Sequence, residues 1–236
     1  MGRLFAISNR TAADPASRAG GLAVAVWESL KSTGGVWAGW SGQTCETPPR
    51  GATVFRDDGV EFLLTDFTQE EFDGFYLRYA NSVLWPVFHY RVDLAQFDHE
   101  AFETYVVVNQ RIANIVAERL QDGDSVWVHD YHFLLIADCL RRAGWDGPTG
   151  FFLHIPFPAP EIFRAIPEHQ WIARALTAYD VIGVQSRRDA ENLSSYLIND
   201  CSGTERADGA ISVFGREVKI KAYPIGIDAN AFSEAA

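Results

Sequence analysis

Short apolar runs alternate with segments of helical periodicity along the chain. Residues 4–7 form an apolar run of strand length, and Leu22, Val26 and Leu30 then recur at the spacing of a helix with one buried face. Further strands are predicted at residues 36–40, 53–56, 60–64, 125–128, 150–153, 180–184 and 218–223, and further helices at residues 68–77, 102–120, 133–142 and 188–198. Such alternation predicts an α/β fold with a doubly wound, mostly parallel, Rossmann-like sheet.

Polar side chains follow several of the predicted strands, at the point where each strand ends. These positions are Ser8-Asn9-Arg10, His129-Asp130, His154, Gln185-Ser186 and Asp228. Because a parallel, doubly wound sheet binds its ligands at the carboxyl ends of its strands, these side chains are expected to share one rim. No repeat, low-complexity tract or linker interrupts residues 1–236, so we expect one domain.

The composition argues against several classes of partner. The chain has 31 acidic and 20 basic residues, a net charge of -11 and no run of Lys or Arg, which disfavours nucleic-acid binding. Cys45, Cys139 and Cys201 lack the spacing of a disulfide framework or a zinc site, which favours a reducing compartment. No signal peptide and no membrane span of ~18 apolar residues can be recognised. We therefore expect a cytoplasmic protein with no membrane partner.

The Gly20-Gly21 pair before the first predicted helix offers free backbone N–H groups and the positive end of a helix dipole, which suit a phosphate. A Gly pair also serves close packing of helix and sheet. Arg10 favours the phosphate interpretation because a guanidinium can hold phosphate through two hydrogen bonds, although a surface ion pair is the alternative. The Gly-x-Gly-x-x-Gly and Walker patterns are absent from this turn, which disfavours a nicotinamide dehydrogenase or a P-loop protein.

The segment from His129 to His132 contains three residues of types that bind metals, namely His129, Asp130 and His132. His129 and Asp130 end a strand and tend to point to opposite sides, whereas His132 begins a helix, so we expect no metal site. Asp130 suits either sugar hydroxyls or a helix N-cap. His154 precedes a rigid segment with two prolines that can aim one side chain, although a lone His at a strand end is more often structural.

Seven sequence blocks occur together in one order. They are SNR (8–10), GGLA (20–23), WAGWSG (37–42), NSVLWPVFHY (81–90), WVHDYH (127–132), HIPFPAPEIF (154–163) and PIGID (224–228). In this order the chain resembles the amino-terminal half of the trehalose 6-phosphate synthase family, retaining glycosyltransferases with the two Rossmann-like domains called GT-B. The resemblance implies that residues 1–236 form the amino-terminal, acceptor-binding domain.

The resemblance implies that glucose is transferred from UDP-glucose, or another nucleotide glucose, to glucose 6-phosphate with retention of configuration. Arg10, Tyr76 and Trp85 match residues that hold the phosphate end of the acceptor, and Trp40 matches a neighbour. Asp130 matches a catalytic residue that binds acceptor hydroxyls at the reacting centre. No cofactor and no obligatory metal are implied.

On the donor side, His154 matches a catalytic residue that contacts the donor glucose, and Gly21 and Leu22 match residues that approach the donor diphosphate. In this family the leaving phosphate helps to deprotonate the incoming hydroxyl on the same face, so no enzymic nucleophile is needed. This suits a sequence in which no nucleophile was recognised.

The chain departs from the family pattern in two places. Thr11-Ala12 stands where the family commonly has Leu-Pro, and the chain stops shortly after Asp228, where the family continues into a carboxyl-terminal donor domain. The alternatives are a synthase of the same fold with another acceptor, as in glucosylglycerol-phosphate synthases or pseudo-glycosidic coupling enzymes, and a non-catalytic sugar-phosphate-binding module.

Overall fold

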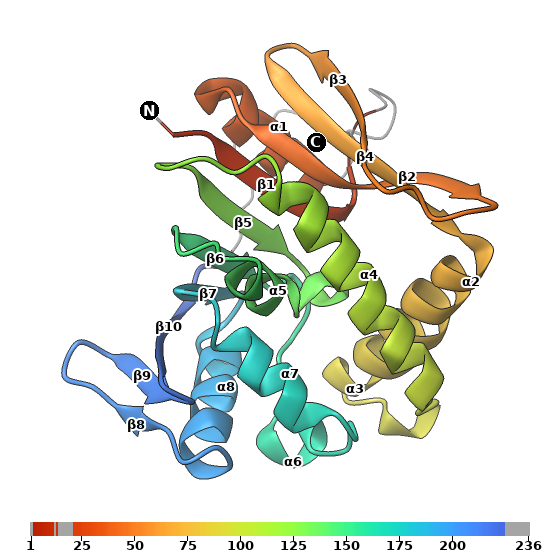
Figure 1. Cartoon of the computed structure of the whole chain (residues 1–236). Helices are drawn as coiled ribbons and strands as arrows, with labels where there is room; N and C mark the ends of the chain where they lie inside the picture. Colours follow the sequence, from red (N-terminus) through yellow and green to blue (C-terminus); the bar gives the residue numbers. More distant parts are fainter. Residues whose placement is uncertain (1, 12, 14–20, 225–236) are drawn as a thin grey trace, which may run out of the picture.

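The computed structural model describes residues 2–11, 13 and 21–224 of the chain (Figure 1). Its strands are β1 (Leu4–Arg10), β2 (Val36–Cys45), β3 (Thr53–Asp57), β4 (Val60–Thr68), β5 (Ser125–His129), β6 (Thr149–Phe152), β7 (Val181–Val184), β8 (Thr204–Glu205), β9 (Ala210–Val213) and β10 (Arg216–Ala222). They form one sheet in the order β3-β4-β2-β1-β5-β6-β7-β10-β9-β8. From β4 to β10 in this order, neighbouring strands are parallel, whereas β3, β9 and β8 are antiparallel to their neighbours. The predicted mostly parallel α/β sheet is confirmed.

Helices cover both faces of the sheet. They are α1 (Gly21–Thr33), α2 (Gln69–Glu71), the π-helix η2 (Phe72–Leu84), α3 (Trp85–Phe88), the 3-10 helix η3 (Val92–Leu94), α4 (His99–Ala117), the 3-10 helix η4 (Tyr131–Phe133), α5 (Ile136–Arg142), α6 (Pro160–Phe163), α7 (His169–Leu176) and α8 (Arg187–Asn199). Successive residues of a strand point to opposite faces. Ala6 of β1 therefore packs in a small core with Val26 and Leu30 of α1, whereas Phe5 and Ile7 pack in the larger core with α4 and α5.

The end of β1 differs from the prediction. The predicted strand covers residues 4–7, whereas residues 8–10 also belong to β1, where Ser8 pairs with Gly39 and Arg10 pairs with Trp40 of β2. The register shifts between these two pairs. Ser8 Oγ also accepts a 2.8 Å hydrogen bond from the buried Trp37 indole. These contacts with β2 extend the strand as far as the rim of the sheet.

The helical segment from residue 69 to residue 88 is longer than the predicted helix at residues 68–77. Thr68 and Glu71 form a capping box at its start. Gly74 does not interrupt the helix but lets it approach α4, because a Cβ there would lie 2.8 Å from Thr104 Oγ1. Pro86 lies in the first turn of α3, where a missing N–H is tolerated. Tyr76 and Trp85 therefore lie on one continuous helical segment.

The other predicted elements are present with shifted bounds. The predicted helix at residues 102–120 begins earlier, at His99, because Asp98 Oδ1 accepts a hydrogen bond from Ala101 N. The helix predicted from residue 133 begins at Ile136, because residues 131–133 form η4. The residues Phe214-Gly215-Arg216 also predict a hairpin turn, and Phe214 and Gly215, both with positive φ angles, form the turn between the antiparallel strands β9 and β10. In the described part of the chain, none of the helices has both the length and the apolar character needed to cross a bilayer.

Candidate active site

A cavity of about 220 Å³ opens at the carboxyl ends of β1 and β5, and it is lined by Ser8, Asn9, Arg10, His129, Asp130 and His132. These two strands are parallel neighbours in the sheet. His154, two residues beyond β6, contacts both His129 and Asp130. The predicted rim is therefore confirmed for these three polar segments. Ser186 instead caps α8 through Asp189, and Asp228 lies outside the described residues.

Asp130 has a strained backbone at the centre of this rim. Its φ angle is +71°, a conformation that non-glycine residues adopt at a cost and that concentrates at functional sites. Its N–H donates to Phe152 O at 2.8 Å, and its Oδ1 accepts from His154 N at 3.3 Å. Its side chain makes no capping hydrogen bond to η4, so the helix-cap alternative is wrong. Burial raises the pKa of Asp130 to about 6, against opposing hydrogen bonds from backbone N–H groups and the charge of His89.

Buried side chains hold the segment after Asp130 from behind. The three consecutive carbonyls of η4 accept hydrogen bonds from Tyr105 Oη at 2.7 Å, Asn109 Nδ2 at 3.2 Å and Tyr179 Oη at 2.9 Å. All three donors lie in the core. Buried backbone carbonyls are normally paired, and here the partners come from other elements. This arrangement fixes the backbone that positions the Asp130 carboxyl group.

Three histidines surround the cavity and are neutral near pH 7. Burial lowers the pKa of His129 to about 3, that of His132 to about 3 and that of His154 to about 4. His129 Nδ1 lies 3.1 Å from His154 Nε2, so these rings are hydrogen-bonded to each other. Among the described residues, no group of three or more His, Cys, Asp or Glu is arranged to hold a metal ion.

Several buried polar atoms of the cavity have no hydrogen-bond partner in the described part of the chain. They are Asn9 Oδ1, His129 Nε2 and both ring nitrogens of His132. Buried polar atoms are normally satisfied, so a cluster of exceptions calls for an explanation. Hydroxyl groups of a bound carbohydrate, which both donate and accept, match this set. The signal in the sequence was the position of Asn9 and His132 beside Arg10 and Asp130, but neither was predicted as a binding residue.

A series of aromatic ring contacts connects Arg10 with His132, another residue of the cavity. The exposed Arg10 places its guanidinium 5.2 Å from the centre of the Trp40 ring, which lies 6.1 Å from the Tyr76 ring. Tyr76 in turn stacks on His132 at 5.6 Å. Among the described residues Arg10 makes no ion pair. Three of the predicted acceptor residues, Arg10, Trp40 and Tyr76, are thus brought together.

Trp85 stands at the start of α3 and is linked to the site through His89. Trp85 is 41% exposed, and its ring centre lies 4.1 Å from that of His89. His89 is also one of the groups that oppose the effect of burial on the pKa of Asp130. Tyr131 Oη donates to Asn81 Oδ1 at 2.9 Å and ties η4 to the helix that precedes Trp85. His89 is a neighbour of the site that sequence reasoning missed.

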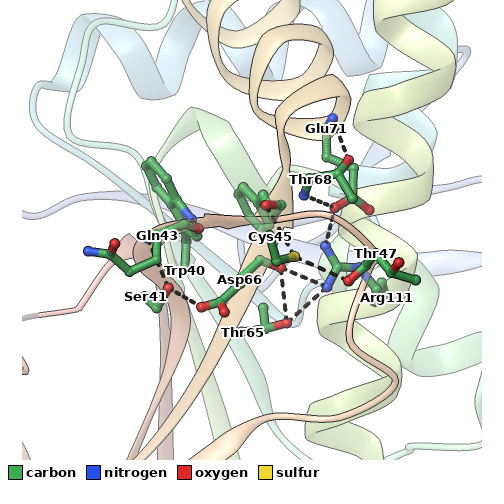
Figure 2. A network of polar contacts seen from close by, with 11 residues as sticks. Trp40, Ser41, Gln43, Cys45, Thr47, Thr65, Asp66, Thr68, Glu71 and Arg111 are labelled. Atoms are coloured by element: carbon green, nitrogen blue, oxygen red, sulfur yellow. Dashed lines mark hydrogen bonds and ion pairs between the residues drawn. The ribbon is translucent and has the colours of Figure 1, made fainter.

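Trp40 is held by a polar network that joins β2, β4, α2 and α4 (Figure 2). Its indole donates to Gln43 O at 2.8 Å. Figure 2 shows Arg111 between the end of β4 and the start of the next helix, where it donates to Asp66 O at 3.2 Å and to Glu71 Oε2 at 2.7 Å. This network connects the strands beside Trp40 to the helical segment that carries Tyr76.

On the predicted donor side, α1 begins at Gly21, as the Gly20-Gly21 signal predicted. Gly20 lies outside the described residues. The roles of Gly21 and Leu22 toward a donor diphosphate therefore stay predictions. His154 is the predicted donor residue that the structure places beside Asp130.

A parallel sheet with polar groups at its strand ends, aromatic rings and a buried carboxylate defines a Rossmann-like domain suited to a sugar ligand. The model of glycosyltransferase family 20 matches residues 5–236. The chain belongs to this family, and the resemblance stated from the sequence is confirmed.

Individual relatives agree with this assignment. A trehalose-6-phosphate synthase from Citrobacter koseri is 40% identical over an alignment of 237 positions, which covers 100% of this chain and 50% of that protein. The crystal structure of a UDP-forming alpha,alpha-trehalose-phosphate synthase from Burkholderia vietnamiensis has a TM-score of 0.96 and 45% identity, over 100% of this chain and 51% of that one. A Burkholderia xenovorans enzyme of the same name, in complex with glucose-6-phosphate, has a TM-score of 0.90 and 40% identity over 98% of this chain and 51% of that one. The chain thus spans about half the length of these relatives.

Proposed function

We propose that this chain is the acceptor-binding half of a trehalose-6-phosphate synthase that transfers glucose from UDP-glucose to glucose 6-phosphate with retention of configuration. The observation that carries the proposal is the cavity between β1 and β5, because an arginine, aromatic rings and unpartnered buried polar atoms converge there. The relatives support it, since one of them was crystallised with glucose-6-phosphate and is named for the release of UDP.

In this proposal the acceptor phosphate binds at Arg10, with Tyr76 and Trp85 beside it. A guanidinium binds a phosphate well, and a local positive charge is needed in a chain whose net charge is -11. Trp40 helps to hold Arg10 in place, because its ring contacts the guanidinium in a cation–π interaction. The sugar ring then extends toward Asp130, whose carboxylate accepts hydrogen bonds from acceptor hydroxyls.

The donor glucose is proposed to contact His154, and its diphosphate to approach Gly21 and Leu22. The bond between the anomeric carbon and the diphosphate oxygen breaks, a new bond to the acceptor hydroxyl oxygen forms on the same face, and the hydroxyl proton passes to the leaving phosphate. Asp130 and His154 orient the two sugars for this step. No side chain of this chain needs to act as a nucleophile.

We assign the acceptor domain to residues 1–236 and expect most nucleotide contacts to come from the half of the relatives that this chain does not cover. Placing the donor's anomeric carbon beside the acceptor hydroxyl requires contacts from both halves. The 236-residue chain alone is therefore expected to bind glucose 6-phosphate and to release no UDP from UDP-glucose.

Two measurements test the proposal. Calorimetric titration of the chain should show tighter binding of glucose 6-phosphate than of glucose or glycerol 3-phosphate. A chimera with the carboxyl-terminal half of the Burkholderia vietnamiensis relative should form trehalose 6-phosphate. A preference for glycerol 3-phosphate would indicate a synthase with another acceptor. Glucose 6-phosphate binding by the chain, together with a folded but inactive chimera, would favour a sugar-phosphate-binding module.

A further inference from the structure

The sheet brings two histidine rings together from neighbouring strands. His129, the last residue of β5, pairs with Phe152 of β6. His154 follows two residues after Phe152 and meets the buried His129 ring, with 3.1 Å between His129 Nδ1 and His154 Nε2. The ring centres are 5.4 Å apart. The contact is therefore a direct consequence of the register between β5 and β6.

The contact couples the hydrogens of the two rings. Burial lowers the pKa of both imidazoles below 6.5, so each ring is neutral near pH 7 and carries one N–H. A hydrogen bond between His129 Nδ1 and His154 Nε2 needs one hydrogen, on one of these two nitrogens. The location of that hydrogen decides whether the other nitrogen of His154, Nδ1, is a donor or an acceptor.

The other nitrogen of His129 indicates which form is present. His129 Nε2 is buried and has no hydrogen-bond partner in the described part of the chain. An orphaned buried N–H is rarer in proteins than an under-satisfied acceptor. The hydrogen of His129 therefore belongs on Nδ1, where it has a partner. His129 then donates to His154 Nε2, and His154 carries its own hydrogen on Nδ1.

The groups around the pair leave this assignment intact. The Asp130 carboxyl group accepts from the backbone N–H of His154. Two aromatic rings also contact the pair. The ring centre of Trp127 lies 4.2 Å from that of His129, and the ring centre of Phe152 lies 4.7 Å from that of His154. Within the described residues His154 Nδ1 makes no hydrogen bond. It is therefore available to a ligand.

We propose that His129 is a positioning residue that fixes His154 in the Nδ1–H tautomer, so that His154 offers a hydrogen-bond donor to an oxygen of a bound sugar. The identity of that sugar rests on the proposed function, whereas the tautomer does not. A fixed donor discriminates by chemistry, because it can donate to an oxygen with a free lone pair but cannot hydrogen-bond to a group that only donates.

The test is long-range proton–nitrogen NMR of the ¹⁵N-labelled chain at pH 7.5, which distinguishes the two neutral histidine tautomers. The six histidines can be assigned with single His→Gln variants. We expect His154 to carry its hydrogen on Nδ1. The Nε2–H tautomer in the parent chain overturns the proposal, whatever sugar the chain binds.

Variants at His129 test the cause. His129→Phe keeps an aromatic ring but removes the donor, so the Nε2–H form of His154 should become populated. His129→Asn places an amide N–H near the position of Nδ1 and should retain the Nδ1–H form. The control His99→Gln, at a mostly exposed position, should leave the His154 signals unchanged. An unchanged tautomer in folded His129→Phe overturns the role of His129, and if that variant does not fold, loss of the Nδ1–H form in His129→Asn does so.

Discussion

The hydroxyl of Tyr105 on α4 donates a 2.7 Å hydrogen bond to the carbonyl of Tyr131, the residue next to Asp130. The same oxygen accepts a 3.0 Å hydrogen bond from Leu134 N, so it bridges both ends of η4. A residue in the helical layer thus fixes the backbone at the rim of the sheet. The strained φ angle of Asp130 persists because this packing determines it.

Tyr105→Phe should therefore weaken glucose 6-phosphate binding more than Tyr179→Phe. Both changes remove one fully buried hydroxyl and leave a carbonyl of η4 unpaired, which costs about 1–3 kcal/mol of stability. Tyr105→Phe also leaves Leu134 N without its acceptor, so its loss of stability should be the larger of the two. Tyr179 holds the carbonyl of Phe133, which is further from Asp130. Thermal unfolding and calorimetry on both variants separate stability from binding. Equal losses of affinity would assign Tyr105 a structural role only.

Arg10→Ala should lower the affinity for glucose 6-phosphate by roughly tenfold or more, since a charged hydrogen bond contributes about 1.5–3 kcal/mol. Binding of glucose, which has no phosphate, should hardly change. Arg10 is exposed, so the fold should tolerate the change. Arg10→Lys keeps the charge but loses the two-pronged geometry, and should fall between the parent and Arg10→Ala. Equal titration curves for the parent and Arg10→Ala would refute the phosphate role.

The sheet was predictable because its strands are short apolar runs and its helices have a clear period. The continuation of the predicted helix beyond residue 77, through the π-helix η2 into α3, was not predictable, because Pro86 is a residue that usually interrupts a helix. Here Gly74 permits close contact with Thr104, which lies on a distant segment. Local sequence reveals a glycine but not the neighbour that requires it.

Some residues of the candidate site could be singled out from the sequence, but their contacts could not. Arg10, Asp130 and His154 were singled out by their places at strand ends. The bond between His129 and His154 depends on the pairing of β5 with β6, and the stack of Tyr76 on His132 depends on how the helical layer packs. Both relationships join residues that are far apart in the sequence, so no local pattern reveals them.

Asp130→Asn should raise the stability of the chain at pH 8 and lower its affinity for glucose 6-phosphate. The folded-state pKa of Asp130, about 6, lies above its ordinary value, so the native state binds the proton more tightly than the unfolded state. This contribution to stability is present below about pH 4 and is lost as the pH rises through 6, by up to about 3 kcal/mol. A neutral Asn avoids that loss.

Thermal unfolding of the parent chain and Asp130→Asn at pH 5 and pH 8 checks the sign. The stabilisation by Asn should be larger at pH 8 than at pH 5, where the native parent is already mostly protonated at this site. A pH-independent difference would mean that burial does not control the carboxyl group. Calorimetry at pH 8 should show the opposite trend for binding, because a carboxylate accepts hydroxyl hydrogen bonds better than an amide.

The ion pair between Arg111 and Glu71 belongs to the polar network that connects the strands beside Trp40 to the helical segment that carries Tyr76. Their side chains are only 14% and 10% exposed, and 2.7 Å separates Nη2 from Oε2. Breaking a buried pair by removing one partner costs about 3–5 kcal/mol, because the remaining charge is left uncompensated. Arg111→Met should therefore lower the melting temperature by roughly 10 °C, at about 2–4 °C per kcal/mol for a domain of this size.

The double variant Arg111→Met/Glu71→Gln should recover part of that loss. Gln at position 71 leaves no uncompensated buried charge, and it can still accept the hydrogen bond from Thr68 N in the capping box. Arg56→Met is the matched control, because Arg56 pairs with Glu61 while its own side chain is 77% exposed, and such a pair contributes at most about 1 kcal/mol. Two results would contradict this role of the buried ion pair. Either Arg111→Met lowers the melting temperature no more than Arg56→Met does, or the double variant loses as much stability as the sum of its two single variants.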